Sequence, residues 1–164
     1  MNKFYEAVAG VLEVPEVGFD TRFRETDGWC SLQAFGLLVM MENDWATPLT
    51  IDRLRGLETV GDLLREAFLT FAAELLQTDR AQLSGASAMG SVPSWDSVNH
   101  LRLVMESEKK FGFSFDLEQI PSIRTIEDFV VGLGAKGFVF GVFDLRTHEQ
   151  PTTNPLPLTT PYLV

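Results

Sequence analysis

Asp96 and Ser97 are the residues whose types and position in this chain are best suited to chemistry. Ser97 opens a series of apolar residues at steps of three and four, which predicts one face of a helix. The series is Val98, Leu101, Val104, Met105 and Phe111, with Glu108 at the same spacing. A hydroxyl at a helix start faces the positive end of the helix dipole, where a phosphate is readily held. Because Ser and Asp are also preferred N-caps, a purely structural capping role is the alternative.

A fainter copy of this start occurs earlier in the chain, where Ser31 follows Trp29 and Cys30. Cys30 takes the position of Asp96, so the copy has no carboxylate before its serine. No acidic residue follows until Glu42. We therefore predict that the start around Ser31 is a degenerate, structural copy, with modification of Ser31 as the less favoured alternative.

Other chemistry finds little support in the sequence. His100 follows Ser97 by three residues, but a nucleophile and base also need an orienting group and an oxyanion hole. His100, His148 and the scattered acids do not have the spacing of metal ligands. No glycine-rich nucleotide-binding loop is present. We expect neither an enzyme nor a metal site, and we interpret Lys109 and Lys110 as a solvated face.

The two serine starts belong to an internal repeat with an offset of 66 residues, which runs without a gap from position 29 to 64. The matched pairs include Trp29 with Trp95, Ser31 with Ser97, Glu42 with Glu108, Trp45 with Phe111, Thr59 with Thr125 and Asp62 with Asp128. This period is too long for a solenoid and close to the size of a minimal domain. The repeat and its helical spacing predict an all-α chain of two small bundles in tandem.

The predicted helices cover residues 2–12, a segment from Ser31 that Pro48 stops, a short turn near 51–57, and segments from 59, 97 and 125. Residues 13–28 are expected to form a loop. Helical spacing continues from 59 to 78, so either one helix crosses from the first bundle into the second or a break lies near Phe68. We place the domain boundaries at 1–64, 65–134 and 135–164.

The last of these regions differs in composition. Residues 138–143 read Phe-Val-Phe-Gly-Val-Phe, an apolar and β-prone segment, and residues 147–161 carry four prolines and five threonines. Such a proline-rich segment is expected to be extended or disordered unless it meets a partner. The Phe-rich segment is expected to pack either on a groove of the bundles or on another protein.

Composition limits the partners. The chain has 164 residues, a net charge of −10 and a pI of about 4.6. Nucleic acid and anionic membranes would repel it, so we expect neither as a partner. No apolar run approaches 18 residues, no signal sequence is recognisable, and the single cysteine, Cys30, suits a reducing compartment. These features favour a cytoplasmic location.

Three motifs in order, over about residues 65–134, resemble the acyl carrier protein or peptidyl carrier protein family. They are Trp95-Asp96-Ser97-Val98, Glu108-Lys109-Lys110-Phe111-Gly112 and Thr125-Ile126-Glu127-Asp128. The family folds as a small four-helix bundle with an Asp-Ser-Leu at the start of its second helix. Val98 departs mildly from that leucine, and Arg102 departs more strongly, because many members carry Glu there.

The resemblance implies that Ser97 accepts 4′-phosphopantetheine from coenzyme A, in a reaction run by a phosphopantetheinyl transferase. It implies that Asp96 helps recruit Mg²⁺ during this priming. The arm then carries acyl or aminoacyl thioesters between activating and transfer enzymes, as in fatty acid, polyketide or nonribosomal peptide biosynthesis. The alternative is a carrier-like docking module in which neither serine is modified.

Overall fold

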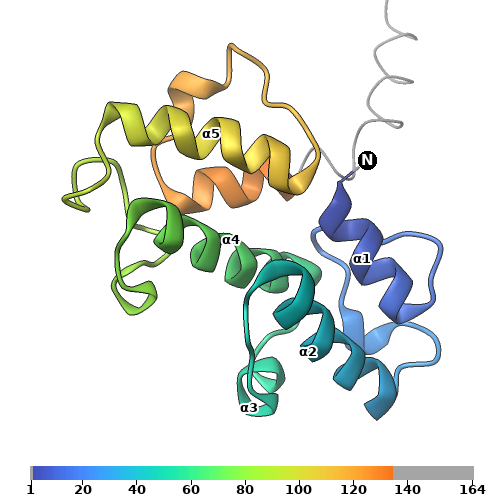
Figure 1. Ribbon diagram of the computed structural model, residues 1–164. Coiled ribbons are helices and arrows are strands. Elements are labelled where there is room, and N and C mark those ends of the chain that lie inside the picture. Colours follow the sequence, from blue (N-terminus) through green and yellow to red (C-terminus); the bar gives the residue numbers. More distant parts are fainter. Residues whose placement is uncertain (1, 135–164) are drawn as a thin grey trace, which may run out of the picture.

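The computed structural model describes residues 2–134 of the chain (Figure 1). Within this part the protein is all helical, as the sequence predicted, and its only β-type pairings are three isolated bridges. The helices are α1 (Lys3–Leu12), α2 (Ser31–Trp45), α3 (Ile51–Arg55), α4 (Val60–Leu76), α5 (Ser97–Phe111) and a last helix over residues 126–134. Three 3₁₀ turns lie at Phe23–Glu25, Arg80–Gln82 and Ile120–Ser122.

Most predicted elements are confirmed, with small shifts at their ends. Asn2 is the N-cap of α1 instead of its first residue, and its side-chain oxygen accepts the backbone N–H of Phe4 at 2.9 Å. The loop predicted over residues 13–28 contains the turn Phe23–Glu25. The Phe-rich segment and the proline-rich segment lie outside the described residues.

Helix α4 is the central element of the fold. It runs without a break from Val60 to Leu76, so the continuous helix is the correct alternative at the junction. Its 17 residues span about 25 Å. Figure 1 shows α4 crossing the middle of the molecule, with α1 and α2 on one side and α5 on the other. Positions 64 and 65, where we placed a domain boundary, both lie inside this helix.

The starts of α4 and of the last helix are built identically. The backbone N–H of Asp62 donates to Thr59 Oγ1 at 3.2 Å, and the N–H of Thr59 donates to the Asp62 carboxylate at 2.9 Å. Asp128 and Thr125 exchange the same two bonds, at 3.1 and 2.9 Å. Both predicted helix starts are therefore confirmed, and each is a reciprocal capping arrangement.

The 66-residue correspondence extends beyond the similar sequences. Helices α2 and α5 begin and end at equivalent positions. The segments before them also pair in the same way with the capped helix starts. The equivalent bridges are Arg22 with Thr59 and Ala88 with Thr125, and the equivalent hydrogen bonds are Val60 N–H to Thr21 O at 2.9 Å and Ile126 N–H to Ser87 O at 3.0 Å. The backbone pairing of these preceding segments is thus repeated even though their side chains differ.

One aromatic cluster joins the two sides of α4. Trp45 and Phe111, the last residues of α2 and α5, stack with ring centroids 5.0 Å apart. Phe4 of α1 lies 5.0 Å from Trp45, and Phe68 of α4 lies 6.0 Å from Phe111 and 5.2 Å from Phe129. All five side chains are buried. Because these rings come from both repeats, the halves share one hydrophobic core.

Ion pairs add to this connection along α4. The buried carboxylate of Glu66 accepts hydrogen bonds from Arg53 of α3 and, at 3.1 Å, from Arg80. Arg65 donates to both carboxylate oxygens of Glu127 on the last helix, at 2.8 and 2.7 Å. This bidentate bond holds the pKa of Glu127 below its usual value.

The apolar periodicity of α5 correctly predicts a helix, but the interpretation of the series as one face is wrong. Val98, Leu101 and Met105 are exposed by 65%, 56% and 56%. The side that packs on the core instead carries His100, Leu103, Val104, Ser107 and Phe111. Two polar residues belong to this buried side, so apolar character alone could not separate the two faces.

Candidate functional site

The start of α5 is formed by an N-cap and the serine that follows it. Asp96 is the N-cap, and its side-chain oxygen accepts the backbone N–H of Asn99 at 2.8 Å. Ser97 is the first helical residue and is exposed. Its hydroxyl makes no hydrogen bond to any residue of the described chain. Because Asp96 performs the capping, the alternative role considered for Ser97 is already filled.

A buried aromatic pair supports this start from beneath. Trp95 is 1% exposed, and its indole N–H donates to Nδ1 of His100 at 3.2 Å. The two rings are nearly parallel, and both lie against Phe129. Burial lowers the pKa of His100, which favours the neutral ring that accepts this bond. Within residues 2–134 no hydrogen bond joins His100 to Ser97.

The equivalent start of α2 has a different cap. Ser31 is again the first helical residue and exposed, but Cys30 precedes it. The side-chain oxygen of Gln33 accepts the backbone N–H of Cys30 at 2.9 Å. Trp29 is only half-buried, packing against Phe23 at 5.5 Å. The first turn of α2 contains no acidic residue, so no carboxylate stands beside Ser31 there.

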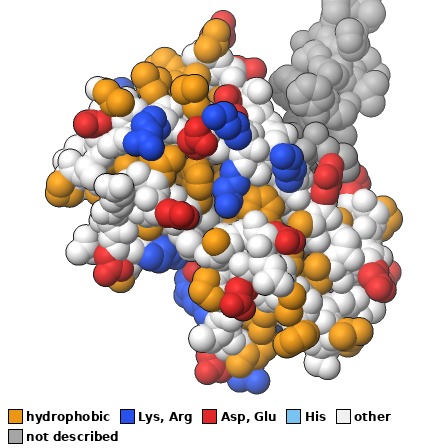
Figure 2. All heavy atoms as spheres, in the orientation of Figure 1, with side chains coloured by type: hydrophobic (Ala, Val, Ile, Leu, Met, Phe, Trp, Pro, Cys, Tyr) orange, Lys and Arg blue, Asp and Glu red, His pale blue; other side chains and the backbone are white. Residues whose placement is uncertain are grey.

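Both helices expose an apolar stripe that follows its serine. The α2 stripe is Leu32, Phe35 and Val39, and the α5 stripe is Val98, Leu101 and Met105. Each member of one stripe lies 66 positions from its counterpart. Leu32 and Phe35 are 75% and 64% exposed. Figure 2 shows hydrophobic side chains gathered at the surface in the lower right of the view, where α2 lies.

The charges beside the two stripes differ. Arg102 and Lys109 lie four residues after Val98 and Met105, on the neighbouring positions of the α5 surface. The equivalent positions on α2 hold Gly36 and Asn43. The α5 stripe is therefore flanked by cations, whereas the α2 stripe is uncharged until Glu42.

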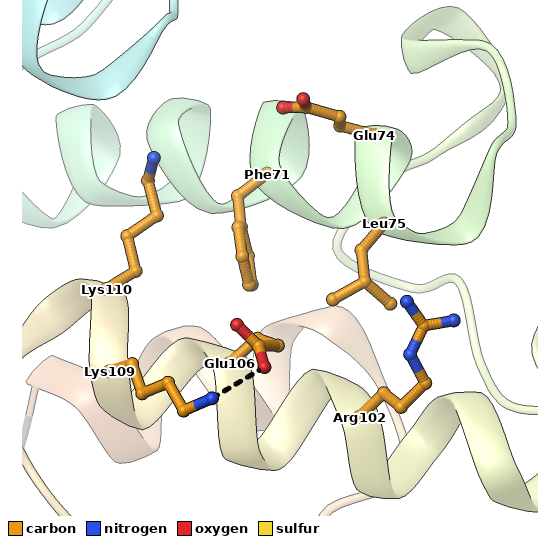
Figure 3. Close-up of a pocket in the computed structure, with 7 residues that line it drawn as sticks. All are labelled: Phe71, Glu74, Leu75, Arg102, Glu106, Lys109 and Lys110. Atoms are coloured by element: carbon orange, nitrogen blue, oxygen red, sulfur yellow. Dashed lines mark hydrogen bonds and ion pairs between the residues drawn. The ribbon is translucent and has the colours of Figure 1, made fainter.

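An open groove of about 460 Å³ lies between α4 and α5 (Figure 3). Phe71 and Leu75 point into it from α4, and Arg102, Glu106, Lys109 and Lys110 line it from α5. Lys109 pairs with Glu106 at 2.9 Å, and the Lys110 ammonium lies 5.9 Å from the Phe71 ring. No sequence pattern indicated this groove, because its residues come from two helices about 30 positions apart. Lys110, interpreted from the sequence as part of a solvated face, is one of the residues that line this groove.

No group of three or more His, Cys, Asp or Glu side chains in residues 2–134 is placed to hold a metal ion. None of the helices in this range is long and apolar enough to cross a membrane. Comparisons with known protein families, curated proteins and solved structures find no match.

Proposed function

We propose that this protein is a carrier that is primed with 4′-phosphopantetheine on Ser97 and shuttles acyl or aminoacyl thioesters between enzymes. The observation that carries the proposal is the exposed Ser97 hydroxyl, which has no partner in the described chain while Asp96 caps the helix. A serine at a helix start that is not needed for capping is available to an external enzyme. The ordered motifs that resemble those of carrier proteins suggest which group is attached to this serine, namely 4′-phosphopantetheine.

In the proposed reaction, Ser97 Oγ attacks the phosphorus of coenzyme A that bears the pantetheine. A new P–O bond forms, the bond to 3′,5′-adenosine bisphosphate breaks, and a base of the transferase takes the hydroxyl proton. Asp96 is exposed and would contribute an oxygen ligand to the Mg²⁺ bound with coenzyme A. The phosphodiester anion then rests at the positive end of α5.

We also propose that the fold is a tandem pair of carrier-like four-helix bundles in which α4 serves both. The first bundle consists of α1, α2, α3 and the first half of α4. The second consists of the rest of α4, α5, the turn Ile120–Ser122 and the last helix. The repeated caps and bridges support this division, since the same contacts recur 66 residues apart.

The cations next to Ser97 bear on the choice of partner enzymes. Arg102 and Lys109 flank the α5 stripe, so a partner that contacts this helix needs an apolar patch with acidic residues beside it. The chain as a whole carries a net charge of −10. Association would thus depend on a local basic surface within an acidic protein, and rising salt should weaken it.

Priming is tested by intact mass after incubation with coenzyme A, Mg²⁺ and a broad-specificity phosphopantetheinyl transferase. We expect the mass to rise by one arm, and peptide mapping to place it on Ser97. The control is the same reaction without transferase. A chain that gains no arm under conditions that prime a known carrier would contradict the proposal.

The second candidate function is an unmodified docking module. The exposed α2 stripe favours it, because an apolar surface beside a serine without a neighbouring carboxylate suits binding better than priming. The mass measurement separates the two functions, since a docking module gains no arm.

A further inference from the structure

The α2 stripe is an apolar surface without a partner in the described chain. Leu32, Phe35 and Val39 follow one another at steps of three and four over about 10 Å of helix. Glu42 continues the same side of α2, three residues after Val39. A partner for this surface therefore needs a short apolar segment that carries a positive charge at the end facing Glu42.

The chain itself contains a segment of this composition directly after the described residues. Residues 138–143 are Phe-Val-Phe-Gly-Val-Phe, with Lys136 before them and Asp144 after them. In an extended segment alternate side chains share one side, which would present Phe138, Phe140 and Val142 together. Three apolar side chains would meet the three residues of the α2 stripe.

The described chain ends close to the correct end of α2. The carbonyl of Gly134 accepts the Tyr5 hydroxyl at 3.2 Å, and the neighbouring Phe4 ring lies 5.0 Å from Trp45, the last residue of α2. From Trp45 back to Leu32 is about 20 Å along the helix. The nine residues 135–143 can span about 30 Å when extended. The segment can therefore reach the whole stripe.

We infer that residues 138–143 dock on the α2 stripe of the same chain, running from the C-terminal to the N-terminal end of α2. In this direction Lys136 comes near Glu42. Asp144 comes near the start of α2, where the helix dipole favours an anion and the first turn supplies none.

The α5 stripe has the same apolar shape but the wrong charges for this segment. Lys109 lies at the end of this stripe that Lys136 would approach and would oppose it, although its ammonium pairs with Glu106 at 2.9 Å; Arg102 lies at the other end, beside Val98. Glu108, which occupies the position of Glu42, is already engaged, because its side chain accepts the backbone N–H of Phe115 at 2.7 Å. The segment thus selects α2, covers the surface beside Ser31 and leaves the surface beside Ser97 open to other proteins.

The test uses the full-length chain and a matched pair of disulfide probes. Both variants carry C30A and D144C; one adds S31C at the start of α2, and the other adds S97C at the equivalent position of α5. With oxidised glutathione as oxidant, we expect the intramolecular disulfide to form about tenfold faster with S31C, because docking raises the local concentration of the thiol introduced at position 144. Non-reducing mass spectrometry follows both reactions.

Two further substitutions check the surface and the charge. F35S should remove the preference for S31C, whereas L101S at the equivalent position should leave it unchanged. K136E should slow the disulfide with S31C, and E42K added to K136E should restore the rate. Circular dichroism of each variant confirms that the helices are retained.

Several outcomes would overturn the inference. Equal rates for the two probes, or a faster reaction with S97C, would show that the segment does not select α2. Interchain disulfides whose rate rises with protein concentration would show that the stripe meets a second copy instead. The assay detects neither priming nor transferase binding, so a protein that is not primed on Ser97 could still pass it.

Discussion

Helices α2 and α5 show how far one framework can be kept while its surface changes. They begin and end at equivalent positions, start with an exposed serine and pack their last aromatic residues against each other. They differ in the cap, which is Cys30 in one and Asp96 in the other, and in the charges beside their stripes. The helix ends and the contact between their last aromatic residues are thus preserved, whereas the cap, the burial of the preceding tryptophan and the exposed side differ.

The largest expected difference between the helices is in priming. Ser97→Ala should abolish transfer of phosphopantetheine to the chain, because it removes the attacking hydroxyl, whereas Ser31→Ala should leave transfer largely intact. Intact mass measures both variants under identical conditions. An arm found on Ser31 alone would reverse the roles that we assign to the two helices.

The next largest effect should come from the helix between them. Ala67 is fully buried within α4, and Ala67→Pro should destabilise the protein by about 3 kcal/mol, because proline breaks a helix interior. We also expect both repeats to be affected, seen as a lower midpoint or as two separate transitions in denaturant unfolding. Ala67→Gly is the matched control and should cost about 1 kcal/mol. An unchanged single transition in the proline variant would contradict a continuous α4.

The tryptophans before the two serines should also differ in their contribution to stability. Trp95→Phe leaves Nδ1 of buried His100 without its donor and should cost about 2 kcal/mol. Trp29→Phe should cost about 1 kcal/mol or less, because Trp29 is half-buried and its indole N–H donates no hydrogen bond within residues 2–134. Urea unfolding measures both. Adding His100→Phe to Trp95→Phe should recover part of the loss, and a failure to do so would locate the cost in packing instead.

Exchanging the caps tests whether they account for the difference between the helix starts. Cys30→Asp should stabilise the chain by about 1 kcal/mol, because aspartate is a preferred N-cap, and Asp96→Cys should destabilise it by a similar amount. Thermal unfolding of the two variants gives the comparison. If Cys30→Asp also made Ser31 a target of the transferase, the carboxylate would be the decisive difference between the helices.

The smallest expected effect is on the pH dependence of stability. The hydrogen bond from Arg65 lowers the pKa of Glu127 from its usual 4.5. The ionised Glu127 therefore contributes stability above pH 4.5, and this contribution is lost as the pH falls below that value. Glu127→Gln should therefore flatten the stability profile in this acid range. Glu106→Gln, in an exposed pair with Lys109, serves as the control and should change the profile less. Identical profiles for the two variants would contradict this role of Glu127.

Local signals in the sequence predicted the helices and their starts well. Thr59 and Thr125 were correctly predicted as helix starts, because a capping arrangement with Asp62 or Asp128 involves residues only three apart. The positions of Asp96 and Ser97 were predicted for the same reason. The continuous α4 remained one of two alternatives, because helical spacing continues equally well across a break.

Features that depend on packing could not be predicted in this way. Leu101 and Val104 have similar hydrophobicity, yet one is exposed and the other buried, since neighbouring helices decide which side of α5 faces the core. The groove beside Arg102 requires α4 and α5 to meet, and the burial of Trp95 and His100 involves the ring of Phe129 on the last helix. Each of these depends on residues distant in the sequence.

The unbroken α4 also fixes the orientation of one serine relative to the other. Each residue of an α-helix contributes about 100° of rotation and about 1.5 Å of translation. Inserting a single residue near the middle of α4 would therefore turn the α5 side of the molecule by more than a quarter of a circle relative to the α2 side. The number of residues in α4 therefore determines the angle between the two sides of the molecule, and with it the relative orientation of Ser31 and Ser97.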